Sequence, residues 1–332
     1  MDNIDKKNLN FSKTNQIIEN AVNTLEQGGI IVLPTDTVYG IAADATNKNS
    51  VKRLYDIKKR DKNKALNILV SSKEMARLCV RTLNDISEKL IDSFWPGALT
   101  LVVEKNEYIP SIVTASKDTI GIRMPQNDIT LAIIEKLGKP IACPSANISN
   151  RPSGTNISDI REDFLNDVDM YIDDGQAHIG IESTIVRVYD NYVRVLRQGY
   201  ITVEDIIQKT GVSVLQDELV KNKTYNINVF SKFVSKQEDL NKLVENNITK
   251  NVAVLGFDDF IKGIKSRKTA KNISFFDLGS SINCDFANKN IYKYLREIEK
   301  GKFDLCIIED VKNLNLNSAI ADILSKIRYK ET

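Results

Sequence analysis

The chain has 332 residues, 42% of them hydrophobic, which is enough for one large domain or two ordinary ones with separate cores. Its 46 basic and 44 acidic side chains nearly cancel, which argues against a strongly basic protein that coats nucleic acid. The four cysteines form no CxxC pair, and this spacing argues against a zinc site and a disulfide framework.

The N-terminal stretch is polar and the longest apolar runs have only the length of strands, so we expect neither a signal peptide nor a membrane span. With the unpaired cysteines, this predicts a protein of the reducing cytoplasm. The single histidine, His178, excludes mechanisms that need several histidine ligands. It stands beside a glycine-rich turn, where a structural role is more common, and we leave it out of the site.

Residues 1–211 are predicted to form an α/β domain in which strands and helices alternate. Because several of the later strands follow one another directly, the sheet is expected to be mixed. The last helix of this domain has Thr202 as a plausible N-cap and ends on Gly211. Strands are expected at 30–34, 65–70, 98–104, 119–125, 140–143, 170–173, 183–189 and 192–197, and helices from about residue 50, up to residue 94 and at 129–137.

Residues 212–250 are rich in Lys, Asn and Gln and are interpreted as a connecting segment with some helix. The pattern restarts in residues 251–332, where apolar runs at 251–257, 272–279 and 303–310 alternate with helical patterns. This βαβαβα order predicts a small, parallel, flavodoxin-like sheet. The fold class is therefore α/β, with a twisted mixed sheet followed by a smaller parallel-sheet domain.

The segment PTDTVYG follows the first strand. If it were extended, Thr35, Thr37 and Tyr39 would share one face and present three hydroxyl groups. The alternative is a plain turn that begins at Pro34 and closes at Gly40.

The segment IKKRDKNK places several cations near the predicted end of a helix. Such cations are usually solvated and complement the helix dipole, which is one interpretation. On an ideal helix, Lys58 and Arg60 would point roughly 200° apart, so both could reach one ligand only after the helix has ended. A role in substrate binding therefore predicts an irregular loop from about Lys58 to Lys64.

The segment TIGIRMP alternates along a predicted strand. Ile120 and Ile122 would face the core, while Thr119 and Arg123 would share the other face with Gly121. An arginine with room above it can grip a carboxylate or phosphate through two N–H groups. The alternative is an arginine exposed on an edge strand.

The segment IACPSANISNRPSGT offers Cys143 and Ser145 as nucleophiles, but no histidine or acid within it could activate them. If the run is extended, Ser145, Asn147 and Ser149 fall on one side. With hydroxyl groups and Arg197 from later segments, the whole set is rich in cations and lacks an evident general base. This profile suits attack of a substrate carboxylate on the α-phosphorus of ATP, where catalysis is mostly positioning and charge stabilisation.

The segments PTDTVYG, IKKR, FWPGALTLV, GIRMP, PIACPSANISNRPSGT, DDGQ, ESTIV and VLRQG occur in this order and resemble the YrdC family over about residues 15–210. The following part resembles the C-terminal domain of the longer, two-domain members, which are threonylcarbamoyl-AMP synthases. The resemblance implies that L-threonine, bicarbonate and ATP with Mg²⁺ yield threonylcarbamoyl-adenylate and pyrophosphate. Other proteins would then transfer the threonylcarbamoyl group to tRNAs that read ANN codons, and a transient tRNA contact is conceivable.

The resemblance also implies site residues. Lys58 and Arg60, a KxR motif, are the expected catalytic residues. Threonine would contact Thr37, Arg123, Cys143 and Ser183. ATP would contact Arg60, Lys64, Thr119, Ser145, Asn147, Ser153 and Arg197. No protein side chain is expected to hold a metal, because Mg²⁺ would arrive with ATP.

The chain departs from the family pattern in some places. Leu69 stands where some members have a histidine beside threonine, and no SPGMKYRHY-like linker sequence occurs between 212 and 250. Two other functions remain open. A double-stranded RNA-binding module could use the same basic surface, although the near-zero net charge speaks against it. A carbamoyl transferase is the second, but related transferases carry zinc-finger cysteine pairs that are absent here.

Overall fold

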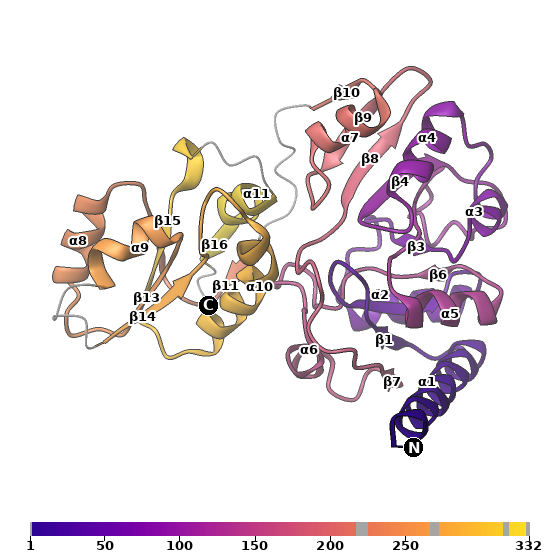
Figure 1. The fold of residues 1–332 in the computed structure, drawn as a ribbon, viewed down its shortest axis with the longest axis horizontal. Helices are drawn as coiled ribbons and strands as arrows, with labels where there is room; N and C mark the ends of the chain where they lie inside the picture. Colours follow the sequence, from indigo (N-terminus) through magenta and orange to yellow (C-terminus); the bar gives the residue numbers. More distant parts are fainter. Residues whose placement is uncertain (1, 217–224, 266–271, 315–318, 330–332) are drawn as a thin grey trace. The chain divides into compact units, whose positions relative to one another are not determined.

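A computed structural model describes residues 2–216, 225–265, 272–314 and 319–329 (Figure 1). These residues cluster into two compact units. The first unit comprises 1–149, 154–178 and 182–220, and the second comprises 150–153, 179–181 and 221–332, each within the described ranges. In that part of the chain, every helix is too short or too polar to span a lipid bilayer.

The first unit is built on a mixed sheet with the strand order β10-β9-β8-β4-β5-β3-β6-β2-β1-β7. Neighbouring strands β4 and β5 are antiparallel, whereas β5 and β3 are parallel, so the sheet is mixed as predicted. The strands are β1 (Ile31–Leu33), β2 (Gly40–Asp44), β3 (Asn67–Leu69), β4 (Leu99–Glu104), β5 (Thr119–Arg123), β6 (Ile141–Ala142), β7 (Met170–Tyr171), β8 (Thr184–Val188), β9 (Val193–Arg197) and β10 (Val214–Leu215).

Asparagine or hydroxyl side chains begin most helices of this unit, because their oxygen atoms accept hydrogen bonds from the first free backbone N–H groups. Asn47 caps α2 in this way, and Thr202 forms a capping box with Asp205 at the start of α7. The helix α7 ends on Gly211 in the left-handed conformation, as the sequence predicted. The helices are α1 (Asp2–Glu26), α2 (Lys48–Ile57), α3 (Lys73–Cys79), α4 (Asp85–Phe94), α5 (Asp128–Leu137), α6 (Ile157–Phe164) and α7 (Val203–Thr210).

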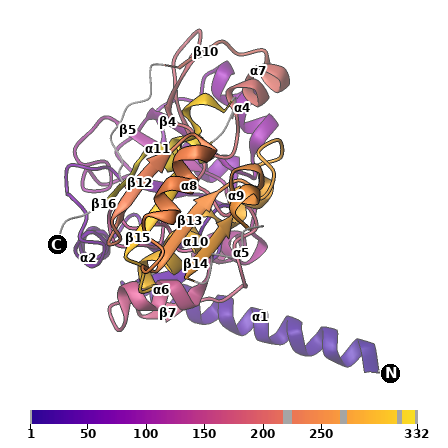
Figure 2. The same ribbon diagram turned by 90° about the vertical axis from the view of Figure 1, so that its left-hand side faces the viewer.

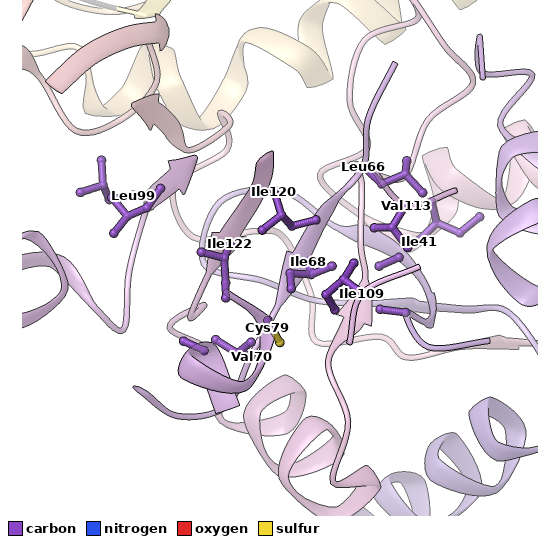
Figure 3. Packing of buried hydrophobic residues seen from close by; sticks show 14 of the residues in the cluster. Ile41, Leu66, Ile68, Val70, Cys79, Leu99, Ile109, Val113, Ile120 and Ile122 are labelled. Atoms are coloured by element: carbon purple, nitrogen blue, oxygen red, sulfur yellow. The ribbon is translucent and has the colours of Figure 1, made fainter. Parts of the chain in front are cut away.

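The two faces of the sheet bury two separate hydrophobic clusters. Alternate strand residues such as Ile68 and Ile122 lie in the larger cluster with side chains from α2, α3 and α4, and Figure 3 shows part of this packing. Leu69, the neighbour of Ile68 in β3, and Ile141, which pairs with Leu69 from β6, lie in the smaller cluster on the opposite face, with α1 and α5. Because side chains alternate along a strand, Arg123 lies on the face of the smaller cluster.

The second unit contains a four-stranded, all-parallel sheet with the order β12-β15-β13-β14. In Figure 2, α8 and α9 lie in front of these strands, and their apolar side chains, such as Leu240 and Ile261, join one cluster with Val254. The elements are β11 (Tyr225–Ile227), β12 (Ser231–Val234), α8 (Gln237–Glu245), β13 (Val252–Gly256), α9 (Asp258–Lys265), β14 (Ile273–Asp277), α10 (Asp285–Lys300), β15 (Leu305–Glu309), η1 (Val311–Asn313), α11 (Ala319–Ser325) and β16 (Ile327–Tyr329).

The predicted fold class is confirmed, with a mixed sheet followed by a smaller parallel one. The sequence prediction omitted β2, whose Gly and Ala residues lack the size of typical strand formers. The segment 212–250 has more regular structure than expected, since it contains β10, β11, β12 and α8, and β12 joins the sheet of the second unit. Residues 217–224 of that segment lie outside the described residues.

Candidate functional site

Arg123 ends a central strand of the first sheet. β5 lies between β4 and β3, so the alternative of an exposed arginine on an edge strand is wrong. Ile120 and Ile122 are buried in the larger cluster, as their alternation predicted. Arg123 itself is only 5% exposed, and an arginine buried to this extent must have hydrogen-bond partners for its charge.

Two chain segments supply those partners. Arg123 Nε donates to the carbonyl oxygen of Gly97 at 2.8 Å, Nη1 donates to Thr37 Oγ1 at 2.8 Å, and Nη2 pairs with the Asp36 carboxylate. Burial lowers the pKa of the Arg123 guanidinium, and the negative charge of Asp36 opposes that shift. A guanidinium has five N–H bonds, so one remains on each terminal nitrogen beyond these three hydrogen bonds.

The segment PTDTVYG forms a compact bend, which agrees with the alternative of a turn and not with that of an extended run. Thr35 Oγ1 donates to the carbonyl oxygen of Val38 at 2.6 Å and lies 3.0 Å from Thr37 Oγ1. The side chain of Tyr39 points away from the two threonines, because its hydroxyl group donates to the Gly175 carbonyl oxygen at 2.7 Å. Thr35 and Thr37 therefore lie together, while Tyr39 anchors the DDGQ segment.

The helix α2 ends at Ile57, and residues 58–64 form an irregular loop, as a substrate role predicted. The side chain of Lys58 is not solvated, since Lys58 is only 2% exposed. Its Nζ donates to the carbonyl oxygen of Asn147 at 2.6 Å and to that of Ser145. For Lys58, the interpretation as a solvated helix-end cation is wrong, because its charge holds the loop at 145–147.

The side chain of Arg60 folds back and bonds to the backbone that follows it. Its Nε donates to the carbonyl oxygen of Lys64 at 3.1 Å, and its Nη2 donates to that of Ala65 at 2.7 Å. Burial lowers the pKa of Arg60, and the nearby positive charge of Arg197 adds to this shift. The side chain of Lys64 is exposed. The loop thus carries one buried cation, one partly buried cation and three exposed ones.

The stretch after β6 is bent, so the expectation of an extended run beyond Ser145 is wrong. Ser145 and Asn147 still lie on the same side, because Ser145 Oγ donates to Asn147 Oδ1 at 2.6 Å. Ser149 Oγ instead donates to the carbonyl oxygen of Lys58 at 3.1 Å. The two hydrogen bonds that Lys58 Nζ donates to carbonyl groups of this loop, and the one between Ser145 and Asn147, therefore fix the position of Ser145.

Cys143 packs against Gly40 in the smaller hydrophobic cluster. A Cβ atom at Gly40 would lie 2.2 Å from Cys143 Sγ, so only glycine leaves room for this thiol. Burial raises the pKa of the Cys143 thiol to about 12. The thiol is therefore almost entirely protonated near neutral pH, which is unfavourable for a nucleophile. His178 is exposed.

Ser183 and Arg197 form a third group. Arg197 Nη2 lies 2.8 Å from the carbonyl oxygen of Ser183 and 3.2 Å from its Oγ. Ser183 Oγ also forms a 2.8 Å hydrogen bond with Thr100 Oγ1 of β4. Thr100 of β4 and Arg197 of β9 thus hold Ser183.

The structure brings most of the expected residues into three groups. Thr37 lies with Arg123, Lys58 with Ser145 and Asn147, and Ser183 with Arg197. The charge of Arg197 lowers the pKa values of both Arg123 and Arg60, which indicates that the arginines are near one another. Thr119 begins β5 and is partly exposed, whereas Ser153 is buried and belongs to the second unit.

The sequence reasoning missed Asp36, Gly97 and Thr100, all of which contact expected site residues. Asp36 had a usable signal, because it stands between two threonines in the PTDTVYG segment. In an extended strand, however, Asp36 would point to the face opposite Thr35 and Thr37. Together these groups contain cations and hydroxyl groups, a combination suited to binding carboxylate and phosphate.

Several known proteins are similar to this chain in sequence. Residues 23–199 match the Sua5/YciO/YrdC family model, which is described as "Telomere recombination". Threonylcarbamoyl-AMP synthase of Pyrococcus abyssi is 30% identical, with 92% of each chain covered. The enzyme of the same name from Schizosaccharomyces pombe is 28% identical, with 95% of this chain and 89% of that one covered.

A similar fold is found among solved structures. The crystal structure of Sua5 from P. abyssi complexed with L-threonine matches with a TM-score of 0.79 and 28% identity, and covers 95% of this chain and 96% of that one. Since these relatives are named for a synthase reaction, the present chain is an enzyme.

Proposed function

The chain belongs to the Sua5/YciO/YrdC family, and from this premise we propose that it is a threonylcarbamoyl-AMP synthase. It is a nucleotidyltransferase of the cytoplasm that converts L-threonine, bicarbonate or CO₂, and ATP into threonylcarbamoyl-adenylate and pyrophosphate. The product supplies the threonylcarbamoyl group for tRNAs that read ANN codons, and separate transferase proteins complete that step.

The observation that carries this proposal is the buried Arg123, held by Thr37, Asp36 and Gly97 with one N–H left on each terminal nitrogen. A carboxylate has two oxygen atoms and accepts two parallel N–H bonds from a guanidinium. The amino-acid carboxylate of threonine is such a group, and the P. abyssi relative was solved with L-threonine. Cys143 and Ser183 complete the proposed threonine pocket.

ATP is proposed to lie along the remaining cations and hydroxyl groups. Arg60, Lys64 and Arg197 offer positive charge to the triphosphate, while Ser145, Asn147 and Thr119 offer hydroxyl and amide groups. Mg²⁺ enters bound to ATP as part of the substrate. Because Lys58 Nζ already contacts two backbone carbonyl groups, its contribution to catalysis is to hold the loop that presents Ser145.

The reaction needs little acid–base chemistry from the protein. The threonine amino group attacks CO₂ and loses a proton, which gives a carbamate. A carbamate oxygen then attacks the α-phosphorus of ATP, a P–O bond forms, and pyrophosphate leaves with its bond electrons. Since the nucleophile is already anionic, the protein contributes orientation and neutralisation of charge.

Mass spectrometry tests the proposal directly. Purified protein is incubated with Mg-ATP, bicarbonate and isotopically labelled L-threonine, and the product is expected to carry both the label and AMP. Omission of threonine or bicarbonate should abolish it. If no labelled adenylate forms, and salt-dependent binding to double-stranded RNA is unaffected by ATP and threonine, the RNA-binding alternative is favoured.

A further inference from the structure

Asp36 is a buried carboxylate at the centre of the threonine group. It is 7% exposed and lies within the PTDTVYG bend. Its Oδ1 accepts hydrogen bonds from Arg123 Nη2 and, at 3.1 Å, from the backbone N–H of Gln126. Its Oδ2 is buried and has no hydrogen-bond partner among the residues that the structure describes.

The ion pair of Asp36 with Arg123 is not an efficient way to stabilise the fold. A buried ion pair repays its desolvation only when its remaining polar atoms are also satisfied, and apolar replacements of similar volume are often equally stable. Asp36 leaves one carboxylate oxygen without a partner, which adds a cost. A pair with an unsatisfied, buried oxygen is unfavourable for the free energy of folding. We infer that its geometry serves another purpose.

The geometry around Arg123 suggests that purpose. The carbonyl oxygen of Gly97, the hydroxyl of Thr37 and the carboxylate of Asp36 each take one N–H of the guanidinium. All three hydrogen bonds have the charged guanidinium as donor, but of the three acceptors only Asp36 also carries a full opposite charge, so its bond gains a Coulombic attraction that the other two lack. Asp36 therefore contributes most to the orientation of the guanidinium plane.

We propose that Asp36 is a positioning residue that fixes the Arg123 guanidinium so that one N–H of each terminal nitrogen meets a substrate carboxylate. Asp36 acts through Arg123, because its own free oxygen is buried. The inference rests on the proposed function in one respect, namely that the substrate is an α-amino acid. It adds that recognition of the carboxylate depends on a residue outside the substrate contact.

The test compares two ligands that differ only in the carboxylate. Ligand-observed NMR measures the affinity of wild type, Asp36→Asn and Asp36→Ala for L-threonine and for L-threoninamide, which has no carboxylate. Loss of a charge-assisted hydrogen bond should weaken threonine binding roughly tenfold or more, and Asp36→Asn, which keeps an acceptor oxygen, should lose less than Asp36→Ala. Affinity for threoninamide and for ATP should not change.

Two controls separate positioning from a structural role. Asp92→Ala removes an exposed carboxylate that pairs with Lys73, and it should leave both affinities unaltered. In an Arg123→Met background, Asp36→Asn should have no further effect on threonine affinity, because its action runs through Arg123. Thermal unfolding checks the fold, and Asp36→Asn carries the test where Asp36→Ala does not fold.

The affinities for threonine and threoninamide distinguish a positioning role from a structural one. Equal losses for threonine and threoninamide would mean a structural role only, and unchanged threonine affinity in Asp36→Asn would also overturn the inference. If wild-type protein binds no threonine at all, the proposed function itself fails, which is a distinct result.

Discussion

The ammonium group of Lys58 donates a 2.6 Å hydrogen bond to the backbone carbonyl oxygen of Asn147, and this links the loop after α2 to the loop after β6. The bond is buried and charge-assisted, so it is among the stronger single contacts in the first unit. A residue expected to be catalytic thus holds the loop that carries Ser145.

Lys58→Met should weaken the use of ATP and destabilise the fold. The substitution leaves two buried carbonyl oxygens without their charged donor, which costs about 1–3 kcal/mol, and it frees the Ser145 loop. We expect KM for ATP to rise more than KM for threonine in a pyrophosphate-release assay. Lys62→Met is the matched control, because its side chain is exposed. An unchanged KM for ATP in a folded Lys58→Met protein would refute the role assigned to Lys58.

Arg123→Lys should leave the fold intact and raise KM for threonine. An ammonium group cannot reproduce a planar fork that has several acceptors, so roughly tenfold or more of the affinity should be lost. KM for ATP should change little. Arg53→Lys provides the control, since Arg53 also pairs with a carboxylate, that of Asp169, but is exposed. Equal threonine dependence of Arg123→Lys and wild type would remove Arg123 from the site.

Gly40→Ala should destabilise the first unit. The new methyl group would lie 2.2 Å from Cys143 Sγ, and overpacking of this kind costs about 1–3 kcal/mol. The double variant Gly40→Ala/Cys143→Ala should recover most of the melting temperature, because the remaining contacts of that methyl group, at 3.6 Å, are ordinary. Failure of the second substitution to rescue the first would show that the clash lies elsewhere.

Cys143 should be inert and dispensable as a nucleophile. Its thiol pKa is raised to about 12 by burial, as are those of Cys79 and Cys306. At pH 7.5, iodoacetamide should label Cys284, which is partly exposed, faster than these three cysteines. Cys143→Ala should retain turnover at saturating threonine. Rapid labelling of native Cys143, or complete loss of kcat in Cys143→Ala, would contradict this assignment.

The second unit should lose stability as pH rises from about 4.5 to 7. Burial raises the pKa of Glu309 to about 7, and nearby Asp259 and Asp258 act in the same direction. A raised pKa means that the native state binds the proton more tightly, so the stabilisation is complete below the unfolded pKa and vanishes above the folded one. Glu309→Gln should flatten this part of a profile of melting temperature against pH. A profile identical to that of wild type would exclude Glu309 as its source.

Much of the fold follows from alternation in the sequence. Ile120 and Ile122 were predicted to face the core because apolar residues occupied every second position of the strand, and this pattern depends only on local geometry. The end of α2 was predicted from the need of Lys58 and Arg60 to reach one ligand. These features are local, so a single sequence can reveal them.

The missed features depend on contacts between distant segments. Asp36 pairs with Arg123, 87 positions away, and Lys58 bonds to Asn147, 89 positions away. Within their own segments, Asp36 and Lys58 look like ordinary polar residues, because their partners lie in other segments. The bend after β6 was missed for the same reason, and the bend at 34–39 was only one of two alternatives, since tertiary hydrogen bonds favour these bends over extended backbone.

The most direct test of the central claim is the threonine dependence of pyrophosphate release from Mg-ATP in the presence of bicarbonate. Wild-type protein should release pyrophosphate rapidly only when L-threonine is added, and Arg123→Lys should need much more threonine for the same rate. Release that is unaffected by threonine, or no release with all substrates present, would contradict the assignment of the chain as a threonylcarbamoyl-AMP synthase.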